Sequence, residues 1–245
     1  MNKKFSAIIL AGGTGSRLAP LTRAISKQLL PVYKYPMICY PIDTLMKMGI
    51  RDILIITAPD QQQMFQKTLA FIKGVNIEYA VQDQPRGLPE ALIIAEEWLD
   101  GDDVVLILGD NIIISNEKIT LQRNTIFSFP VQHPERYGVV TTDEDGGIKE
   151  LIEKPLHTNS RDAVIGLYIF DNNACQLAKQ LKPSARGELE IVDLIREADR
   201  LKKVKVKKLQ GFWFDAGNHD DLLDCANLVR VIEHRRSEPL ITWNT

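Results

Sequence analysis

Through the first half of the chain, short apolar runs alternate with longer amphipathic stretches. The apolar runs predict strands over residues 6–10, 52–57, 76–81 and 103–108, and the amphipathic stretches predict helices over residues 36–48, 61–73 and 88–99. Pro36 and Gly49 suit the first turn and the end of the first of these helices. Strands separated by helices at this spacing favour βαβ units, because a parallel strand is reached only through a long crossover. The order of the elements therefore predicts an α/β fold with a parallel sheet and right-handed crossovers.

The second half has a less regular pattern. Strands are predicted over residues 125–131, 137–142, 148–152, 164–170, 204–209 and 212–214, and helices over residues 172–181, 189–201 and 219–235. The segment Asp145-Gly146-Gly147 predicts a hairpin turn between two of the strands. No repeat, low-complexity tract or linker separates the two halves. We therefore expect residues 1–245 to form a single domain around a shared sheet, with a fraying tail after Ser237.

The charge balance excludes several classes of partner. The 245 residues include 30 basic and 32 acidic ones, which gives a formal net charge of −2. The chain therefore lacks the strong positive charge that favours binding to nucleic acid or to a membrane. An anionic ligand must instead be held by local side chains. No apolar run reaches the roughly 18 residues of a membrane-spanning helix, and the run 7–11 is too short for a signal peptide. We expect a cytoplasmic protein whose three scattered cysteines, Cys39, Cys175 and Cys225, are free and buried.

A glycine-rich loop directly follows the first predicted strand, in the segment Leu10-Ala11-Gly12-Gly13-Thr14-Gly15-Ser16-Arg17-Leu18. Three glycines within four positions allow a sharp bend whose N–H groups point into one concavity, an arrangement that binds phosphate. Arg17 could close over this loop and neutralise phosphate charge with its forked donors. Lys27 follows shortly afterwards, where its ammonium could hold a phosphate or a leaving pyrophosphate as a point charge. For each cation alone, an ordinary surface position is the alternative.

Two familiar nucleotide-binding loops do not fit this segment. A P-loop requires Gly-Lys-Ser or Gly-Lys-Thr, which the chain lacks. A dinucleotide fingerprint requires a third glycine where Leu18 stands. It also requires an acidic residue at the end of the second strand, which ends at Thr57 without one. Both classes are therefore excluded.

The motifs resemble, in order and over nearly the whole chain, those of the sugar-nucleotide pyrophosphorylases, and among them the glucose-1-phosphate thymidylyltransferases. Beyond the glycine loop and Ser26-Lys27-Gln28, the matching segments are 36–57, 81–83, 86–88, 108–111, 134–139, 153–155, 166–168, 182–191 and 213–217. The resemblance implies a three-layer, Rossmann-like nucleotidyltransferase fold with a mixed, mainly parallel central sheet and a small β-rich sugar-binding lobe. The nucleotide-binding half would span about residues 1–110 and the sugar-binding half about residues 111–236.

The resemblance also implies an activity. The chain would make a nucleoside-diphosphate sugar, dTDP-glucose in the first instance, and pyrophosphate from dTTP and a hexose 1-phosphate such as glucose 1-phosphate. It implies Mg²⁺ as cofactor and a homo-oligomer, a dimer or a tetramer, as assembly. The alternatives are the same chemistry with UTP or a modified hexose 1-phosphate, a non-catalytic nucleotide-sugar binding protein, and a glycosyltransferase. The last requires an Asp-x-Asp metal motif, but Asp143-Glu144-Asp145 belongs to the predicted hairpin turn.

Carried over residue by residue, the resemblance assigns roles in the reaction. It gives catalysis to Arg17, Lys27 and Asp110; metal binding to Asp110 and Asp215; nucleotide contacts to Leu10, Gly12, Gly13, Thr14, Gly15, Gln82 and Gly87; and sugar-phosphate contacts to Tyr137, Gly138, Glu153, Lys154, Val164 and Trp213. Both metal-binding aspartates follow predicted strands, at the sheet edge where open α/β sheets bind ligands, although turn aspartates are equally common there. Val192 stands where the family has a threonine that can contact a sugar hydroxyl, which leaves the choice of hexose open.

Overall fold

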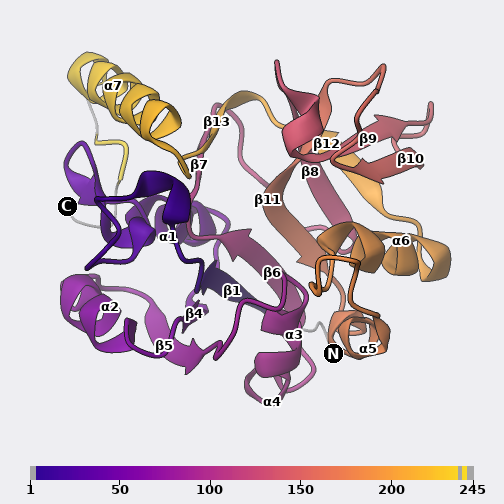
Figure 1. Cartoon of the computed structure of the whole chain (residues 1–245), viewed down its shortest axis with the longest axis horizontal. Coiled ribbons are helices and arrows are strands. Elements are labelled where there is room, and N and C mark those ends of the chain that lie inside the picture. The colour runs from indigo at the N-terminus through magenta and orange to yellow at the C-terminus, as the bar shows by residue number, and fades with distance from the viewer. Residues whose placement is uncertain (1–3, 237–238, 242–245) are drawn as a thin grey trace. The chain divides into compact units, whose positions relative to one another are not determined.

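The computed structural model describes residues 4–236 and 239–241 and divides them into two units. Unit 1 comprises the residues up to Ile8, Pro85–Leu106 and Thr120–Gln210. Unit 2 comprises Ile9–Gln84, Ile107–Ile119 and the residues from Gly211 onward. The boundaries fall within β1 (Phe5–Ala11) and β6 (Asp103–Leu108), so each unit contains part of both strands (Figure 1).

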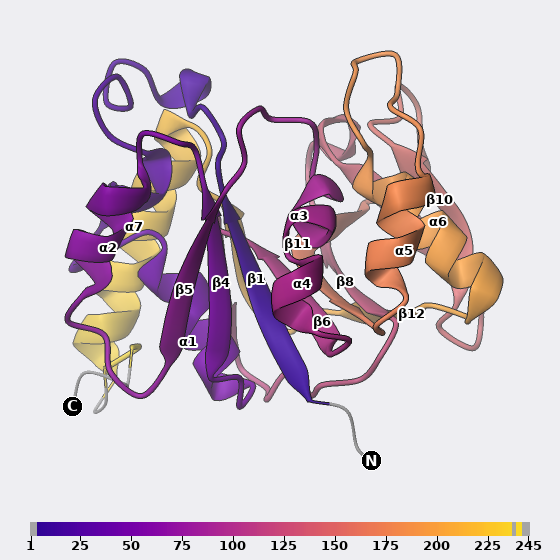
Figure 2. The same cartoon turned by 90° about the horizontal axis from the view of Figure 1, so that it is seen from below.

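Unit 2 contains the predicted βαβ units. In it β1 neighbours β4 (Asp52–Thr57), and β4 pairs in parallel with β5 (Asn76–Val81), as Figure 2 shows. The isoleucine-rich run of β4 is buried almost throughout, as a strand covered on both faces requires. The helices of this unit are α1 (Cys39–Lys47), α2 (Gln62–Leu69) and α7 (His219–Arg235). The Asn218 side chain caps α7 by accepting a hydrogen bond from the Asp221 N–H.

A second strand pair in unit 2 joins distant parts of the chain. β7 (Asn111–Ser115) pairs antiparallel with β13 (Gly211–Asp215), and the register sets Asp215 opposite Asn111. Two short strands, β2 (Pro31–Val32) and β3 (Tyr35–Pro36), form a separate small ladder. The β7–β13 pair therefore brings the segment after β6 and the segment before α7 to one place.

Unit 1 contains most of the antiparallel strands. β11 (Asp162–Phe170) neighbours β6 and pairs antiparallel with β8 (Thr125–Pro130) and β9 (Gly138–Thr142). β10 (Ile148–Glu153) pairs antiparallel with β9, and β12 (Lys205–Lys208) pairs in parallel with β8. Its helices are α3 (Glu90–Ile94), α4 (Glu96–Leu99), α5 (Ala174–Gln180) and α6 (Ile191–Leu201). Helix α6 buries Ile191, Val192, Leu194, Ile195 and Ala198, the spacing of one helical face.

Most predicted elements are confirmed, and the exceptions have local causes. β4, β5, β6 and α7 have the predicted bounds. Pro36 does not open a helix, because it belongs to β3, and α1 begins at Cys39 instead. The predicted helix 88–99 is divided at Ala95 into α3 and α4. Strand β7 was not predicted, because Asp110-Asn111 reads as a turn sequence.

Other expectations concern the cysteines, the tail and the domain count. The three cysteines are free and buried, as predicted. The fraying tail is wrong for Leu240 and Ile241, which are buried, while Ser237 lies outside the described residues. No helix within residues 4–236 and 239–241 is long and apolar enough to cross a membrane. The single domain with a division near residue 110 stays a prediction.

Candidate active site

The glycine loop of unit 2 packs against Lys27. Gly15 has a left-handed backbone with φ of +63°, and its carbonyl accepts a hydrogen bond of 2.8 Å from Thr22 Oγ1. A Cβ on Gly15 would lie 3.0 Å from Thr22 Cγ2 and 3.2 Å from Lys27 Cβ. A Cβ on Gly13 would lie 3.7 Å from Lys27 Nζ. Larger residues at these positions would therefore displace the lysine that the loop now accommodates.

Lys27 lies beside a polar network at the start of a short 3-10 helix (Lys27–Leu29). Ser26 Oγ donates to Gln28 Oε1 at 2.5 Å, and the Ser26 N–H donates to Gln61 Oε1 at 3.2 Å. The Lys27 ammonium in turn donates to Asp110 Oδ2. The side chains of Lys27 and Asp110 are 13% and 11% exposed, so solvent weakens this ion pair little.

Two carboxylates meet at the strand ends of unit 2. Asp110 follows β6 and Asp215 ends β13, and the Ala216 N–H donates to the Asp110 carbonyl at 3.0 Å. Burial, and then the negative charge of Asp110, raise the pKa of Asp215 to about 6. Arg17 Nη2 lies 3.8 Å from Asp215 Oδ2 and, like Lys27, lowers this pKa. Added positive charge beside the two carboxylates would favour the ionised form of Asp215.

The donor set fits a hard divalent cation completed by a ligand. Within the described residues, no group of three or more His, Cys, Asp or Glu side chains could hold a metal ion. Magnesium, unlike zinc or calcium, is commonly bound through one or two carboxylates together with water and substrate phosphates. The carboxylates of Asp110 and Asp215 fit this kind of site.

The predicted base-binding glutamine lies beside the same loop. A Cβ on Gly12 would lie 3.1 Å from Gln82 Oε1, and the buried Gln82 donates its backbone N–H to the Thr57 carbonyl at 2.9 Å. Leu10 is half-buried near the end of β1, and Thr14 is exposed at the tip of the loop. Unit 2 thus brings together all predicted nucleotide contacts except Gly87. Gly87 lies in unit 1 and forms a β-bridge with Leu189.

Four predicted sugar-phosphate residues gather in unit 1. The β9–β10 register places Glu153 opposite Gly138, and the Lys154 N–H donates to the Tyr137 carbonyl at 2.9 Å. Lys154 has a left-handed backbone, with φ of +44°, and its ammonium lies 3.4 Å from Glu153 Oε1. A non-glycine residue in this conformation carries local strain, a condition common at functional sites. The fifth residue, Val164, is buried in β11, the neighbour of β9.

Two further residues complete the surroundings of Glu153. Arg186 Nη2 lies 3.6 Å from Glu153 Oε1 and also binds both carboxylate oxygens of Glu190, at 2.9 Å and 2.8 Å. A Cβ on Gly138 would lie 3.1 Å from Cγ2 of the buried Val192. The sequence placed Arg186 in a motif but assigned it no role. Arg186 and Glu190 lie in the non-helical segment before α6, so their spacing in the sequence gave no signal of this ion pair.

The remaining predictions concern Trp213 and the Asp-x-Asp segment. Trp213, predicted for the sugar pocket, lies in unit 2, where its indole N–H donates to Asn111 Oδ1 at 2.7 Å. Asn111 is the residue that the sequence analysis missed in this unit. Asp143 accepts hydrogen bonds from the N–H groups of Asp145 and Gly147, at 3.0 Å and 2.7 Å, which confirms the hairpin turn. The Asp-x-Asp segment is therefore explained without a metal.

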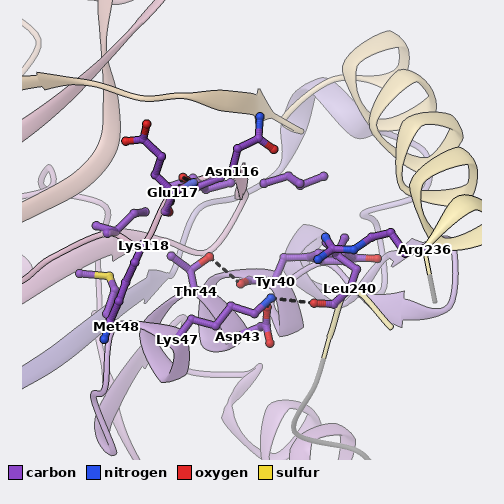
Figure 3. A pocket seen from close by; sticks show the side chains of 14 residues that line it. Tyr40, Asp43, Thr44, Lys47, Met48, Asn116, Glu117, Lys118, Arg236 and Leu240 are labelled. Carbon is purple, nitrogen blue, oxygen red and sulfur yellow. Dashed lines mark hydrogen bonds and ion pairs between the residues drawn. The ribbon is translucent and has the colours of Figure 1, made fainter. Parts of the chain in front are cut away.

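A separate cavity of about 370 Å³ lies in unit 2 between α1, the segment Ile113–Ile119 and the tail (Figure 3). Lys47 spans part of it, with an ion pair of 2.5 Å to Asp43 and a hydrogen bond of 2.7 Å to the Leu240 carbonyl. None of the predicted site residues lines this cavity. The candidate site is therefore defined by the glycine loop and the two carboxylates.

Comparison with known proteins identifies the family. The profile of the family described as Nucleotidyl transferase matches residues 6–230. The chain belongs to this family. This nucleotidyl transferase is 47% identical over 239 residues to the glucose-1-phosphate thymidylyltransferase of Neisseria meningitidis, covering 93% of this chain and 83% of the relative. It is 44% identical over 240 residues to the enzyme of that name from Mycobacterium tuberculosis, covering 94% and 83%.

Solved structures agree with this membership. A crystal structure of a presumed glucose-1-phosphate thymidylyltransferase from Bacillus anthracis, in complex with a sucrose, matches the nucleotidyl transferase with a TM-score of 0.85 at 37% identity, covering 93% of this chain and 96% of the other. A UDP-glucose pyrophosphorylase complexed with UDP-glucose has the same fold, with a TM-score of 0.83 at 24% identity, covering 94% and 99%. The predicted mixed α/β nucleotidyltransferase fold with a mostly parallel central sheet is confirmed.

Proposed function

We propose that this chain is a glucose-1-phosphate thymidylyltransferase, which forms dTDP-glucose and pyrophosphate from dTTP and glucose 1-phosphate. The observation that carries the proposal is the pair of the buried Asp110 and the half-buried Asp215, close to each other beside Lys27 and the glycine loop. The relatives named as glucose-1-phosphate thymidylyltransferases, at 41% to 47% identity, support dTTP over UTP.

In this proposal unit 2 binds the nucleoside triphosphate. The N–H groups of the glycine loop and the cations of Arg17 and Lys27 hold its phosphates. Each cation lies beside a carboxylate, and a metal ion bound to these carboxylates would neutralise them and leave the cations to bind phosphate. Gln82 offers an amide that can pair with a pyrimidine edge. Mg²⁺, held by Asp110 and Asp215, supplies positive charge to the phosphate oxygens when bound.

Unit 1 binds the sugar phosphate in this proposal. The Lys154 ammonium, which lies 3.4 Å from Glu153 Oε1, holds the phosphate, and Glu153 accepts hydrogen bonds from sugar hydroxyls. Arg186 Nη2, 3.6 Å from Glu153 Oε1, helps to orient this carboxylate.

The reaction needs no protein nucleophile, because the sugar phosphate is already an anion. One of its oxygens attacks the α-phosphorus of dTTP in line, a new P–O bond forms, and the bond to the bridging oxygen breaks, so pyrophosphate leaves with its electron pair. The contribution of Arg17 and Lys27 is alignment and neutralisation of two anions that repel each other.

The test is pyrophosphate release measured over a grid of nucleoside triphosphates and hexose 1-phosphates. We expect dTTP with glucose 1-phosphate to give the highest kcat/KM, and we expect Asp110→Asn to abolish turnover. Asp145→Asn, in the exposed turn, is the matched control and should retain full activity. Near-normal turnover of Asp110→Asn would contradict the metal assignment. A preference for UTP or for a modified hexose 1-phosphate would show that the substrates differ from the proposed dTTP and glucose 1-phosphate.

Further parts of the proposal need their own measurements. Binding of the nucleotide sugar without any pyrophosphate release would favour the non-catalytic binding protein instead. We expect a homo-oligomer, a dimer or a tetramer, which light scattering would establish. A cytoplasmic location and the lack of binding to nucleic acid or membranes belong to the same proposal.

A further inference from the structure

The carboxylate of Asp110 is contacted from two directions in unit 2. Lys27 donates to its Oδ2, and the side-chain amide of Asn111 donates to its Oδ1 at 3.2 Å. Because each oxygen has its own donor, rotation of the carboxylate about the Cβ–Cγ bond would break both contacts. The side chain of Asp110 is therefore held in one orientation before any ligand binds.

The amide of Asn111 is itself held in one orientation. An asparagine amide can exchange its oxygen and nitrogen by a half turn, and the turned form would direct its oxygen at the carboxylate of Asp110. The Trp213 indole N–H lies 2.7 Å from Asn111 Oδ1, and indole can only donate. The oxygen of Asn111 must therefore face Trp213, which leaves the NH₂ group to face Asp110.

Trp213, Asn111 and Asp110 form a buried chain of hydrogen bonds in unit 2. Trp213 donates to Asn111, and Asn111 donates to Asp110, so each hydrogen bond polarises the next in the same sense. Asn111 and Trp213 come from the paired strands β7 and β13, which fixes their separation through the backbone. All three side chains are buried, so water competes little for these bonds.

We propose that Asn111 is a positioning residue for the metal-binding carboxylate of Asp110, and that Trp213 sets the orientation of Asn111. This inference rests on the proposed function, because it assumes that Asp110 binds a divalent cation. It assigns Trp213 a role in unit 2 that is separate from any contact with the sugar. It also predicts that the two residues act on the metal as one unit.

The test uses the full-length chain and two readouts. Binding of Mn²⁺ to the protein alone is followed by the loss of the free-ion EPR signal, and the Mg²⁺ concentration for half-maximal pyrophosphate release is measured separately. Trp213→Phe removes the donor but keeps a ring, and Asn111→Ala removes the amide. We expect each to weaken Mn²⁺ binding and raise the Mg²⁺ requirement roughly tenfold, the effect of one hydrogen bond to a charged group.

The double variant separates positioning from general structural damage. If Trp213 acts through Asn111, Trp213→Phe should add almost nothing to the metal defect of Asn111→Ala, whereas independent effects would multiply. Trp98→Phe, in unit 1, is the control for loss of an indole and should leave metal binding unchanged. If thermal melting shows that Asn111→Ala is unfolded, Trp213→Phe alone decides.

The outcomes distinguish this inference from the proposed function. Unchanged Mn²⁺ binding in folded Trp213→Phe, or fully multiplicative defects, would overturn the positioning role even if the wild type is active. The proposed function would be refuted if the wild type binds Mn²⁺ but releases no pyrophosphate. If Trp213→Phe still weakens Mn²⁺ binding in that case, the positioning role stands.

Discussion

Replacement of Lys27 by methionine should destabilise the metal-free protein far more than loss of an ordinary surface lysine. The ammonium is only 13% exposed and pairs with a carboxylate that is 11% exposed. Methionine preserves most of the aliphatic stem beside Gly13 and Gly15, so the change removes charge rather than packing. Asp110 and Asp215 would then repel each other, with Arg17 as the nearby cation that the structure pairs with Asp215.

The size of the effect follows from the burial of the pair. Breaking a buried ion pair by removing one partner costs roughly 3–5 kcal/mol, and the slight exposure here favours the lower end, about 3 kcal/mol. For a chain of this length that corresponds to a fall in melting temperature of about 6–12 °C. Added Mg²⁺ should restore more than half of the loss, because a divalent cation at the two carboxylates replaces the missing charge.

The assay is thermal and urea unfolding with EDTA and with Mg²⁺, for the wild type and for Lys27→Met. Lys208→Met is the matched control, since Lys208 pairs with Asp162 at 2.8 Å but its side chain is 59% exposed. Exposed pairs contribute about 1 kcal/mol at most, and no effect of Mg²⁺ is expected there. Equal losses in the two variants, or a Lys27→Met defect that Mg²⁺ does not change, would refute the reasoning.

Three other predictions concern pH and two glycines. Because the pKa of Asp215 is raised to about 6, the carboxyl keeps its proton below that pH and Mg²⁺ must displace it. The Mg²⁺ concentration for half-maximal pyrophosphate release should therefore rise as the pH falls below about 6 and be nearly constant above it; a flat profile down to pH 5 would contradict this. Gly217→Ala should lower kcat while the fold survives, because the added Cβ would lie 2.7 Å from Arg17 Nη2 and displace the guanidinium. Steady-state kinetics together with a melting curve would test this. An unchanged kcat would count against a role for Arg17. Gly87→Ala should lower the free energy of unfolding by more than about 3 kcal/mol in urea, because φ of Gly87 is +104° and the added Cβ would lie 2.7 Å from the Leu189 N atom. A loss under about 1 kcal/mol would contradict this and would mean that the loop can relax.

The fold was largely predictable because its strands are short apolar runs with clear ends. β4, β5 and β6 have the bounds expected from hydrophobic pattern alone. β7 was missed because Asp110-Asn111 resembles a turn, and only its pairing with distant β13 makes the following residues a strand. Sequence pattern carries no information about a partner so far along the chain.

The site was predictable to the extent that it lies in contiguous motifs. The resemblance assigned both Lys27 and Asp110 to catalysis without placing them beside each other, and the structure shows that they form an ion pair. The hydrogen bond from Trp213 to Asn111 could not be anticipated, because it depends on the register of two strands and on the direction of an indole. The resemblance assigned Trp213 to the sugar pocket, and its hydrogen bond to Asn111 is visible only in the structure.

The pairing of β7 with β13 also has a consequence for how such chains can diverge. The register sets Asp215 opposite Asn111 through backbone hydrogen bonds, whatever the length of the polypeptide that connects the two strands. Insertions, deletions or exchange of residues in Thr120–Gln210 can therefore alter unit 1, which we propose binds the sugar phosphate, while both carboxylates keep their places. A family built this way can acquire new sugars by remodelling one connection and leave its chemistry untouched.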